Sequence, residues 1–368
     1  MQLRSVSFPI YDMIKKELKY SYNDVSIVPA KVSGIEHRKE CDPFQTSGML
    51  PLFTAPMTSV VGLKSYTKFE DHGIIPIIPR SVDYSVRLKK LSQGIWSAFS
   101  LKEVKNVMIS QESFGLGCNC CLLIDIANGH MLDLYDTVKK LKSRHPNLSI
   151  MVGNIANPDT YEVCEKSGVD YVRVGIGSGR GCITSSNVSI HYPMASLVEE
   201  TRAIKDKIGG RCKIVADGGI RNYSDIIKAL ALGADYVMAG SIFNKMLESE
   251  GQILADDKIP LTENDIREIV YKGDKKFMIR GFSHTLFKKF YGMASGSGQI
   301  AIEGKKTKTS EGIEMYLPIE YTIKSWTENF KDYMRSAMSY TGAHNLEEFI
   351  GRVNLVVISE NTYRSINK

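Results

Sequence analysis

The sequence lacks the segments that would direct it into a membrane or out of the cell. No apolar run among its 368 residues approaches the ~20 residues of a membrane span, and residues 1–24 contain no signal-peptide core. Its seven cysteines are an odd number without disulfide-like spacing, which is typical of a reducing compartment. We therefore expect a cytoplasmic protein that does not contact a membrane.

The sequence also has little excess charge of either sign. Lys and Arg exceed Asp and Glu by 47 to 41, a formal net charge of +6, and the basic residues are scattered. Such scatter does not indicate a nucleic-acid partner. An anionic small ligand and a plain solvated surface explain the excess equally well. A 43% hydrophobic content suits a globular chain with a sizeable core.

Short apolar runs recur along the chain and predict its fold. Eight runs are each followed by a stretch of helical period, and they cover residues 51–55, 74–78, 94–99, 121–126, 148–152, 170–174, 212–216 and 235–239. Continuous apolar runs are typical of strands that are covered on both faces, as in a parallel sheet. Eight such units predict an α/β fold, the (β/α)8 TIM barrel.

The rest of the chain elaborates this barrel. SGVDYVRVG (167–175) and LGADYVMAG (232–240) share a Gly-x-Asp-Tyr-Val core, which suits equivalent units, although so short a match can arise by chance. We expect one domain over residues 1–368, with a lead-in at 1–50 and a mobile, Gly-rich and Lys-rich flap at 294–312 followed by a C-terminal extension.

Glycines and polar residues follow the predicted strands, where the active sites of TIM barrels lie. They are Asp125, Asn128 and Gly129 after the fourth run, Asn154 after the fifth, Gly177 and Gly179 after the sixth, Asp217, Gly218 and Gly219 after the seventh, and Gly240 and Ser241 after the eighth. Glycine turns after the last two strands predict a phosphate site, because several backbone N–H groups can converge on an anion there. Ordinary tight turns are the alternative.

Cys182 differs from the other cysteines. Cys120, Cys121, Cys164 and Cys212 lie in apolar strand or helix patterns that predict core packing, and residues 118–121 lack the partners of a zinc site. Cys182 lies in a polar loop beside Gly181. A thiol at the barrel rim can act as a nucleophile, with Thr184, Glu311 and the basic residues of the flap as candidate proton carriers. An ordinary loop cysteine is the alternative.

Several motifs together resemble the IMP dehydrogenase and GMP reductase family. They are YNDVSIVPA (22–30), GIGSGRGCIT (175–184), ADGGIRNYSDIIKALALGADYVMAGSIF (216–243), FYGMAS (290–295) and SYTGAHNLEEF (339–349). They occur in order between about residues 20 and 358. The resemblance implies that Cys182 attacks C2 of a purine mononucleotide and forms a covalent thioimidate.

The same resemblance implies the other site residues. Backbone carbonyls of Gly177, Gly179 and Cys182 would bind a monovalent cation such as K⁺. Arg180 stands where the family has its phosphate-binding serine. The residues implied for the phosphate are therefore Gly219, Gly240, Ser241 and Tyr291. Asp217 and Gly218 are implied for the ribose, and Gly292 and Met293 for the base, with Ser178 nearby. The implied residues for the nicotinamide cofactor are Arg80, Asp125, Ala127, Asn128, Gly129 and Asn154.

Two features favour the reductase branch of this family. The barrel strands follow one another without room for a CBS regulatory domain, and the flap has no Arg-Tyr pair to activate water. KTSEGIE instead resembles the reductase, in which Glu311 and Thr184 would transfer protons while GMP is converted to IMP and ammonia with NADPH. The family also implies a homo-tetramer or octamer.

Departures from the family leave other activities open. Thr58, Arg80 and the long stretch 251–290 depart from its usual sequence. An IMP dehydrogenase without the regulatory domain, converting IMP to XMP with NAD, is one alternative. An enzyme for a deoxy- or modified purine nucleotide is a second, and a nucleotide-binding protein without turnover is a third.

Overall fold

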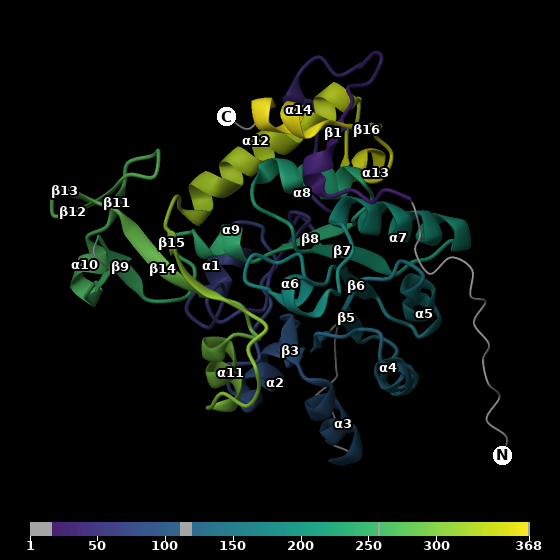
Figure 1. The fold of residues 1–368 in the computed structure, drawn as a ribbon, viewed down its shortest axis with the longest axis horizontal. Coiled ribbons are helices and arrows are strands. Elements are labelled where there is room, and N and C mark those ends of the chain that lie inside the picture. The colour runs from purple at the N-terminus through teal and green to yellow at the C-terminus, as the bar shows by residue number, and fades with distance from the viewer. Residues whose placement is uncertain (1–16, 111–119, 257, 367–368) are drawn as a thin grey trace.

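A curved parallel sheet forms the centre of the molecule (Figure 1). The computed structural model describes residues 17–110, 120–256 and 258–366. Seven strands lie in the order β2-β8-β7-β6-β5-β4-β3. They are β2 Leu52–Thr54, β3 Ser97–Phe99, β4 Cys121–Asp125, β5 Ser149–Ile155, β6 Tyr171–Val174, β7 Lys213–Asp217 and β8 Tyr236–Ala239. Each lies within or next to a predicted run.

The predicted second strand closes the sheet into a barrel although it forms no regular strand. Ile75 bridges Phe53 of β2, and Ile78 bridges Ser97 of β3, both in parallel. Pro76 and Pro79 interrupt the run, and proline has no N–H to donate to a ladder. The segment therefore makes only these isolated bridges, and the predicted eight-membered barrel is confirmed.

Helices surround the barrel and bury its outer face. Seven of them are α1 Tyr66–Glu70, α2 Tyr84–Ser92, α3 Leu101–Ser110, α4 Leu132–Arg144, α5 Thr160–Lys166, α7 Met194–Ile208 and α8 Tyr223–Ala231. The short helices α6 Thr184–Val188 and α9 Ser241–Asn244 lie in the segments after β6 and β8. Val172 and Val174 of β6 point outward into this layer and are fully buried. Alternate residues point inward, because side chains along a strand change face at every step.

The N-terminal end of the barrel is filled by an aromatic plug, which we define as Phe53, Trp96, Tyr171 and Tyr236. The ring centroids of Phe53 and Trp96 lie 5.7 Å apart and those of Trp96 and Tyr171 lie 5.1 Å apart. Tyr236 lies 5.1 Å from Phe53 and 5.7 Å from Tyr171. These rings occupy the interior at this end, so the barrel is a packed core rather than a pore.

The eighth outer helix comes late in the chain. Helix α12 (Ile323–Thr341) lies beside α8 (Figure 1), where Trp326 stacks on Tyr223 with centroids 5.2 Å apart. Trp326 also meets Phe243 of α9 edge to face at 5.2 Å. In the described ranges, no helix is both long and apolar enough to cross a bilayer.

The two ends of the described chain meet on the outside of the barrel. Strand β1 (Val25–Ile27), which follows the 3-10 helix η1 (Tyr22–Asp24), pairs antiparallel with β16 (Leu355–Val357). A second 3-10 helix, η2 (Arg38–Glu40), completes the described part of the lead-in, and α13 (Leu346–Phe349) and α14 (Glu360–Ile366) flank β16. Residues 1–16 of the predicted lead-in lie outside the described residues.

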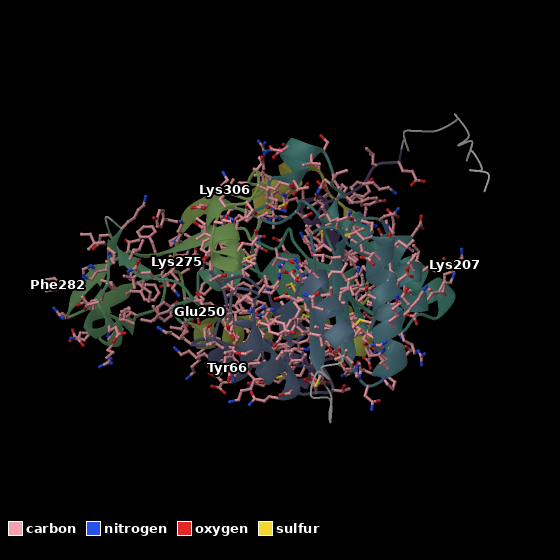
Figure 2. All side chains as sticks on the ribbon, turned by 90° about the horizontal axis from the view of Figure 1, so that it is seen from below. Tyr66, Lys207, Glu250, Lys275, Phe282 and Lys306 are labelled. Carbon is pink, nitrogen blue, oxygen red and sulfur yellow. The ribbon has the colours of Figure 1, made fainter. Side chains whose placement is uncertain are left out.

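Between β8 and α12 the chain builds two small sheets that the sequence did not predict. One sheet has the order β10-β9-β14-β15, and the other has the order β11-β12-β13. The elements are β9 Ile253–Ala255, β10 Ile259–Pro260, α10 Glu263–Arg267, β11 Val270–Tyr271, β12 Phe277–Ile279, β13 Phe282–His284, β14 Leu286–Tyr291, α11 Gly296–Glu303 and β15 Glu314–Pro318. Residues 253–286, which we call the arm, project from the barrel and carry exposed Phe282 near their far end (Figure 2).

A buried lysine fastens β14 to the turn after β8. Lys288 is fully buried, and its Nζ donates to backbone oxygens of Met246, Leu247 and Ser249 and to the Ser249 hydroxyl at 2.5 to 2.9 Å. Burial lowers the pKa of Lys288 to about 7. Since β14 leads into the predicted flap, these bonds set where the flap begins.

Candidate functional site

The loop that follows β6 carries Cys182 and is held against the end of the flap. Cys182 and Gly312 form an antiparallel bridge. The Ile183 N–H donates to the Glu311 carbonyl at 3.0 Å, and the Ile313 N–H donates to the Gly181 carbonyl at 3.0 Å. The two segments are 127 residues apart at Thr184 and Glu311, yet the backbone places them side by side.

Three glycines permit this close approach. A Cβ on Gly292 would lie 2.4 Å from the Gly181 carbonyl oxygen, and a Cβ on Gly312 would lie 3.0 Å from the same atom. A Cβ on Gly181 would lie 3.0 Å from the Gly292 nitrogen. Any side chain at these positions would push the flap away from the cysteine loop.

Cys182, Thr184 and Glu311 form a hydrogen-bonded chain. The Cys182 Sγ donates to Thr184 Oγ1 at 3.2 Å, and Thr184 Oγ1 donates to Glu311 Oε2 at 3.0 Å. All three side chains are partly exposed. The three residues singled out in the sequence thus lie together, in an arrangement that can move a proton from sulfur to carboxylate.

The other described cysteines lack such a setting. Cys120, Cys164 and Cys212 are buried. Burial raises the pKa of the Cys164 thiol to about 12 and also raises that of Cys212. Cys121 is half-buried, and desolvation raises its thiol pKa to about 12. The thiols of Cys121, Cys164 and Cys212 therefore resist ionisation, as expected for core packing. Within the described ranges no cluster of three His, Cys, Asp or Glu residues suits a metal, and Cys118 lies outside them.

A buried arginine that sequence reasoning missed organises the barrel mouth. Arg173 of β6 donates through Nη1 to Asp125 Oδ1 at 2.7 Å, and through Nε and Nη2 to Asp217 Oδ2 at 3.1 and 2.9 Å. Asn154 Nδ2 also donates to Asp217 Oδ2, at 2.8 Å. Burial opposes the charge of Arg173, but the carboxylates of Asp217 and Asp125 outweigh it and raise its pKa. Two predicted ligand-binding carboxylates are therefore held by one guanidinium.

The predicted phosphate turn after β7 packs on the cysteine loop. Gly218 and Gly219 have φ of 119° and 73°, a region that favours glycine. The Gly219 N–H donates to the Ser178 carbonyl at 2.9 Å, and a Cβ on Gly218 would lie 2.9 Å from the Ser178 Cβ. The Ser178 hydroxyl is buried and has no hydrogen-bond partner among the described residues. An unsatisfied hydroxyl in this position fits a polar ligand group.

The turn after β8 approaches the same loop through the ring of Phe290. A Cβ on Gly240 would lie 3.9 Å from the Phe290 ring, and that ring would lie 3.1 Å from a Cβ on Gly181. Ser241 is buried at the start of α9. Tyr291, Gly292 and Met293 lead from β14 into the flap and are partly exposed. These predicted substrate-binding residues therefore surround the cysteine loop.

The predicted cofactor residues divide into two groups. Both backbone groups of Gly129 have protein partners, since its N–H donates to the Asn154 carbonyl at 2.8 Å and its carbonyl accepts from the Tyr135 hydroxyl at 2.5 Å. Ala127 and Asn128 are exposed beside it. Packing alone explains Gly129, so its role toward a cofactor remains a prediction.

The second group lies where the sequence departs from its family. The Thr58 hydroxyl donates to the Ser81 hydroxyl at 2.7 Å. This bond links the loop that follows β2 to the loop that follows the 74–78 segment. The Arg80 Nε beside Ser81 is buried, and no residue in the described ranges bonds to it. A buried, unpaired guanidinium nitrogen fits an acceptor such as a cofactor phosphate or carboxamide.

The predicted cation ligands are already engaged within the loop. The Gly177 carbonyl accepts from the Ser185 hydroxyl at 3.0 Å, and the Gly179 carbonyl accepts from the Cys182 N–H at 3.0 Å. Each carbonyl oxygen keeps a second lone pair, so these bonds do not exclude a further ligand. The monovalent cation at Gly177, Gly179 and Cys182 stays a prediction.

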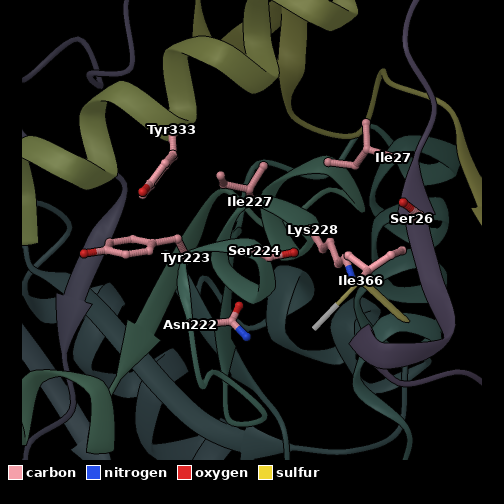
Figure 3. Close-up of a pocket in the computed structure, with 9 residues that line it drawn as sticks. All are labelled: Ser26, Ile27, Asn222, Tyr223, Ser224, Ile227, Lys228, Tyr333 and Ile366. Carbon is pink, nitrogen blue, oxygen red and sulfur yellow. The ribbon is translucent and has the colours of Figure 1, made fainter. Parts of the chain in front are cut away.

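A surface pocket of about 730 Å³ lies apart from these residues (Figure 3). It opens between β1, α8 and α12, and Tyr223, Lys228 and Tyr333 line it. It contains none of the residues predicted for the site. The pocket therefore lacks the cysteine, threonine and glutamate that come together at Cys182.

A barrel with a cysteine at its mouth and a proton path to a glutamate defines a candidate enzyme of the TIM-barrel class. Residues 119–367 match the model of the IMP dehydrogenase / GMP reductase domain. The chain therefore belongs to the IMP dehydrogenase/GMP reductase family. It is 28% identical to proteins named GMP reductase from Shewanella halifaxensis (strain HAW-EB4) and Vibrio atlanticus (strain LGP32), covering 94% of this chain and 97% of each relative.

Proposed function

We propose that the protein is a purine nucleotide oxidoreductase that converts GMP to IMP and ammonia with NADPH. The observation that carries the proposal is the chain from the Cys182 Sγ through Thr184 to Glu311 in a member of this family. Relatives named GMP reductase match over nearly the full chain, which favours the reductase over the dehydrogenase.

In this mechanism the site residues first remove ammonia. The Cys182 proton moves through Thr184 to Glu311, and the thiolate adds to C2 of GMP. The same path returns the proton to the departing 2-amino group, because an amine leaves readily only when it is protonated. The carbon–nitrogen bond breaks, ammonia leaves, and a thioimidate joins Cys182 to the purine.

The second half of the reaction releases the sulfur. NADPH, when bound, supplies the hydride that reduces C2. The carbon–sulfur bond then breaks, Cys182 regains its electron pair as a thiolate, and IMP is formed. The Arg173 cluster at the mouth holds Asp125 and Asp217 in place for the ribose groups of the two ligands. Because the flap has no Arg-Tyr pair to activate water, the thioimidate reacts with hydride rather than with water.

A direct assay tests this function. Purified protein should consume NADPH in the presence of GMP and release IMP and ammonia in equal amounts, measured by the fall in NADPH absorbance and by chromatography. No GMP-dependent loss of NADPH would refute the reductase. IMP-dependent formation of NADH would identify the dehydrogenase alternative. Tight GMP or IMP binding with neither reaction nor adduct would identify a binding protein.

Glu311→Gln should lower kcat for GMP about 10²- to 10⁴-fold, the usual contribution of a positioned acid or base. The amide cannot accept and return the proton, yet the Glu311 carbonyl that binds the Ile183 N–H is retained. Nucleotide affinity measured by calorimetry should stay near that of the wild type.

Glu303→Gln is the matched control, because it changes a carboxylate of α11 that bonds to Thr307 and not to Thr184. Its kcat should be unchanged. A Glu311→Gln enzyme as fast as the control would remove Glu311 from the mechanism.

A further inference from the structure

Gln299 is a buried polar side chain inside the predicted flap, and the proposed reaction does not use it. It lies in α11 and is 3% exposed. Its Oε1 accepts from the Thr307 and Lys308 N–H groups, each at 3.0 Å. Its Nε2 donates to the Ala294 and Lys308 carbonyls at 3.3 and 3.2 Å. One side chain therefore joins the residue before α11 to residues 305–311, which we call the return segment.

The Ala294 carbonyl also holds Glu311. The Glu311 N–H donates to it at 3.1 Å, so this one oxygen accepts both from the Gln299 amide and from the backbone of Glu311. The carboxylate of Glu311 lies 3.0 Å from Thr184 Oγ1. A displacement of Ala294 or of the return segment would therefore move Glu311 away from Thr184.

A partly exposed ion pair anchors the start of α11 to the strands β14 and β15. Glu314 of β15 accepts from the Ser297 N–H at 2.7 Å and pairs with Lys289 of β14 at 2.8 Å. Lys289 Nζ also donates to the Ser297 hydroxyl at 2.8 Å. The hydrogen bonds from Lys289 and Ser297 lower the pKa of Glu314 to about 2, so the pair stays charged at neutral pH. The helix that carries Gln299 is thus fixed at one end by residues outside the flap.

We propose that Gln299 positions Glu311 for proton transfer. This inference rests on the proposed function, because it takes Glu311 to be the proton carrier. The anchored helix α11 sets the place of Gln299, and four hydrogen bonds from its amide set the place of the return segment. An apolar side chain at this position would leave two carbonyls and two N–H groups without partners, and the return segment would have to move to reach water. Gln299 acts through Glu311 and is a positioning residue.

Gln299→Met tests the proposal, because methionine keeps the length of the side chain and removes its hydrogen bonds. The kcat for GMP should fall about 10- to 100-fold, since a misplacement of about 1 Å at a reacting group can cost that much. KM for GMP should change far less, because the glycine turns that we expect to hold the nucleotide belong to other loops. The unfolding midpoint measured by circular dichroism should stay near that of the wild type, since α11 lies outside the barrel (Figure 1).

A double-mutant cycle separates positioning from a general effect on the flap. In the Glu311→Gln background, Gln299→Met should lower kcat no further, because the group that it places is already inactive. The same fold-loss in both backgrounds would mark a structural role and overturn the proposal. A wild-type kcat for Gln299→Met would overturn it as well, and so would a variant that is unfolded at the assay temperature, because Gln299 would then support the fold as a whole.

Gln45→Met is the matched control. It makes the same chemical change in a side chain that donates to the Asp235 carbonyl at 3.0 Å, just before β8 and therefore at the opposite end of that strand from the candidate site. Its kcat should equal that of the wild type. A wild-type protein that consumes no NADPH with GMP would refute the proposed function and this inference together. An active wild type with an unimpaired Gln299→Met variant would refute this inference alone.

Discussion

Cys182→Ala is expected to lose GMP-dependent turnover by about 10⁴-fold or more, because no other described thiol is placed to replace the nucleophile. Nucleotide binding should remain, since the glycine turns after β7 and β8 that we expect to hold the phosphate do not involve the sulfur. Mass spectrometry should find a nucleotide adduct on the wild-type protein during turnover and none on the variant.

Two further variants sharpen this prediction. Ser186→Ala changes a residue of helix α6, shortly after Cys182, that bonds only to neighbouring residues, and it should retain activity. Cys182→Ser replaces the thiol with a hydroxyl of similar size that does not ionise readily, so the variant should be nearly as inactive as Cys182→Ala. Normal turnover by Cys182→Ala would show that the reaction does not pass through this residue.

Arg173→Met should lower the free energy of unfolding by about 3–5 kcal/mol, the cost of removing one partner from a buried ion pair. The variant leaves Asp125 and Asp217 facing each other without a counter-charge in the barrel interior. Urea denaturation followed by circular dichroism measures the loss. Adding Asp125→Asn should restore part of it, because one uncompensated charge is then removed.

Arg364→Met is the comparison for this effect. Arg364 pairs with Glu360 on the surface of α14, where both side chains are largely exposed to solvent. Its removal should leave the unfolding midpoint almost unchanged, because exposed pairs contribute little. Equal midpoints for Arg173→Met and Arg364→Met would show that the Arg173 cluster does not stabilise the barrel.

The barrel could be predicted from the sequence because each strand is a continuous apolar run. Even the run at 74–78, where Pro76 and Pro79 prevent a regular ladder, keeps its place in the barrel. The arm could not be predicted, since its strands β9 to β13 are only two or three residues long. Such short segments carry too little periodicity to be separated from loops.

The candidate site was predicted in part. Position after a strand pointed to Cys182 and Asp217, and the resemblance of KTSEGIE to the reductase pointed to Glu311. Arg173 was missed because it lies inside the apolar run DYVRV and was counted with the strand. A charge within a strand covered on both faces requires a buried counter-charge, and that signal could have revealed it. Its partners, far away in the sequence, could not be identified without the fold.

The aromatic plug constrains how ligands reach the sulfur. Phe53, Trp96, Tyr171 and Tyr236 fill one end of the barrel, so a ligand of the proposed reaction can approach Cys182 only from the opposite end. The packing of the barrel therefore confines the proposed chemistry to the carboxyl ends of the strands.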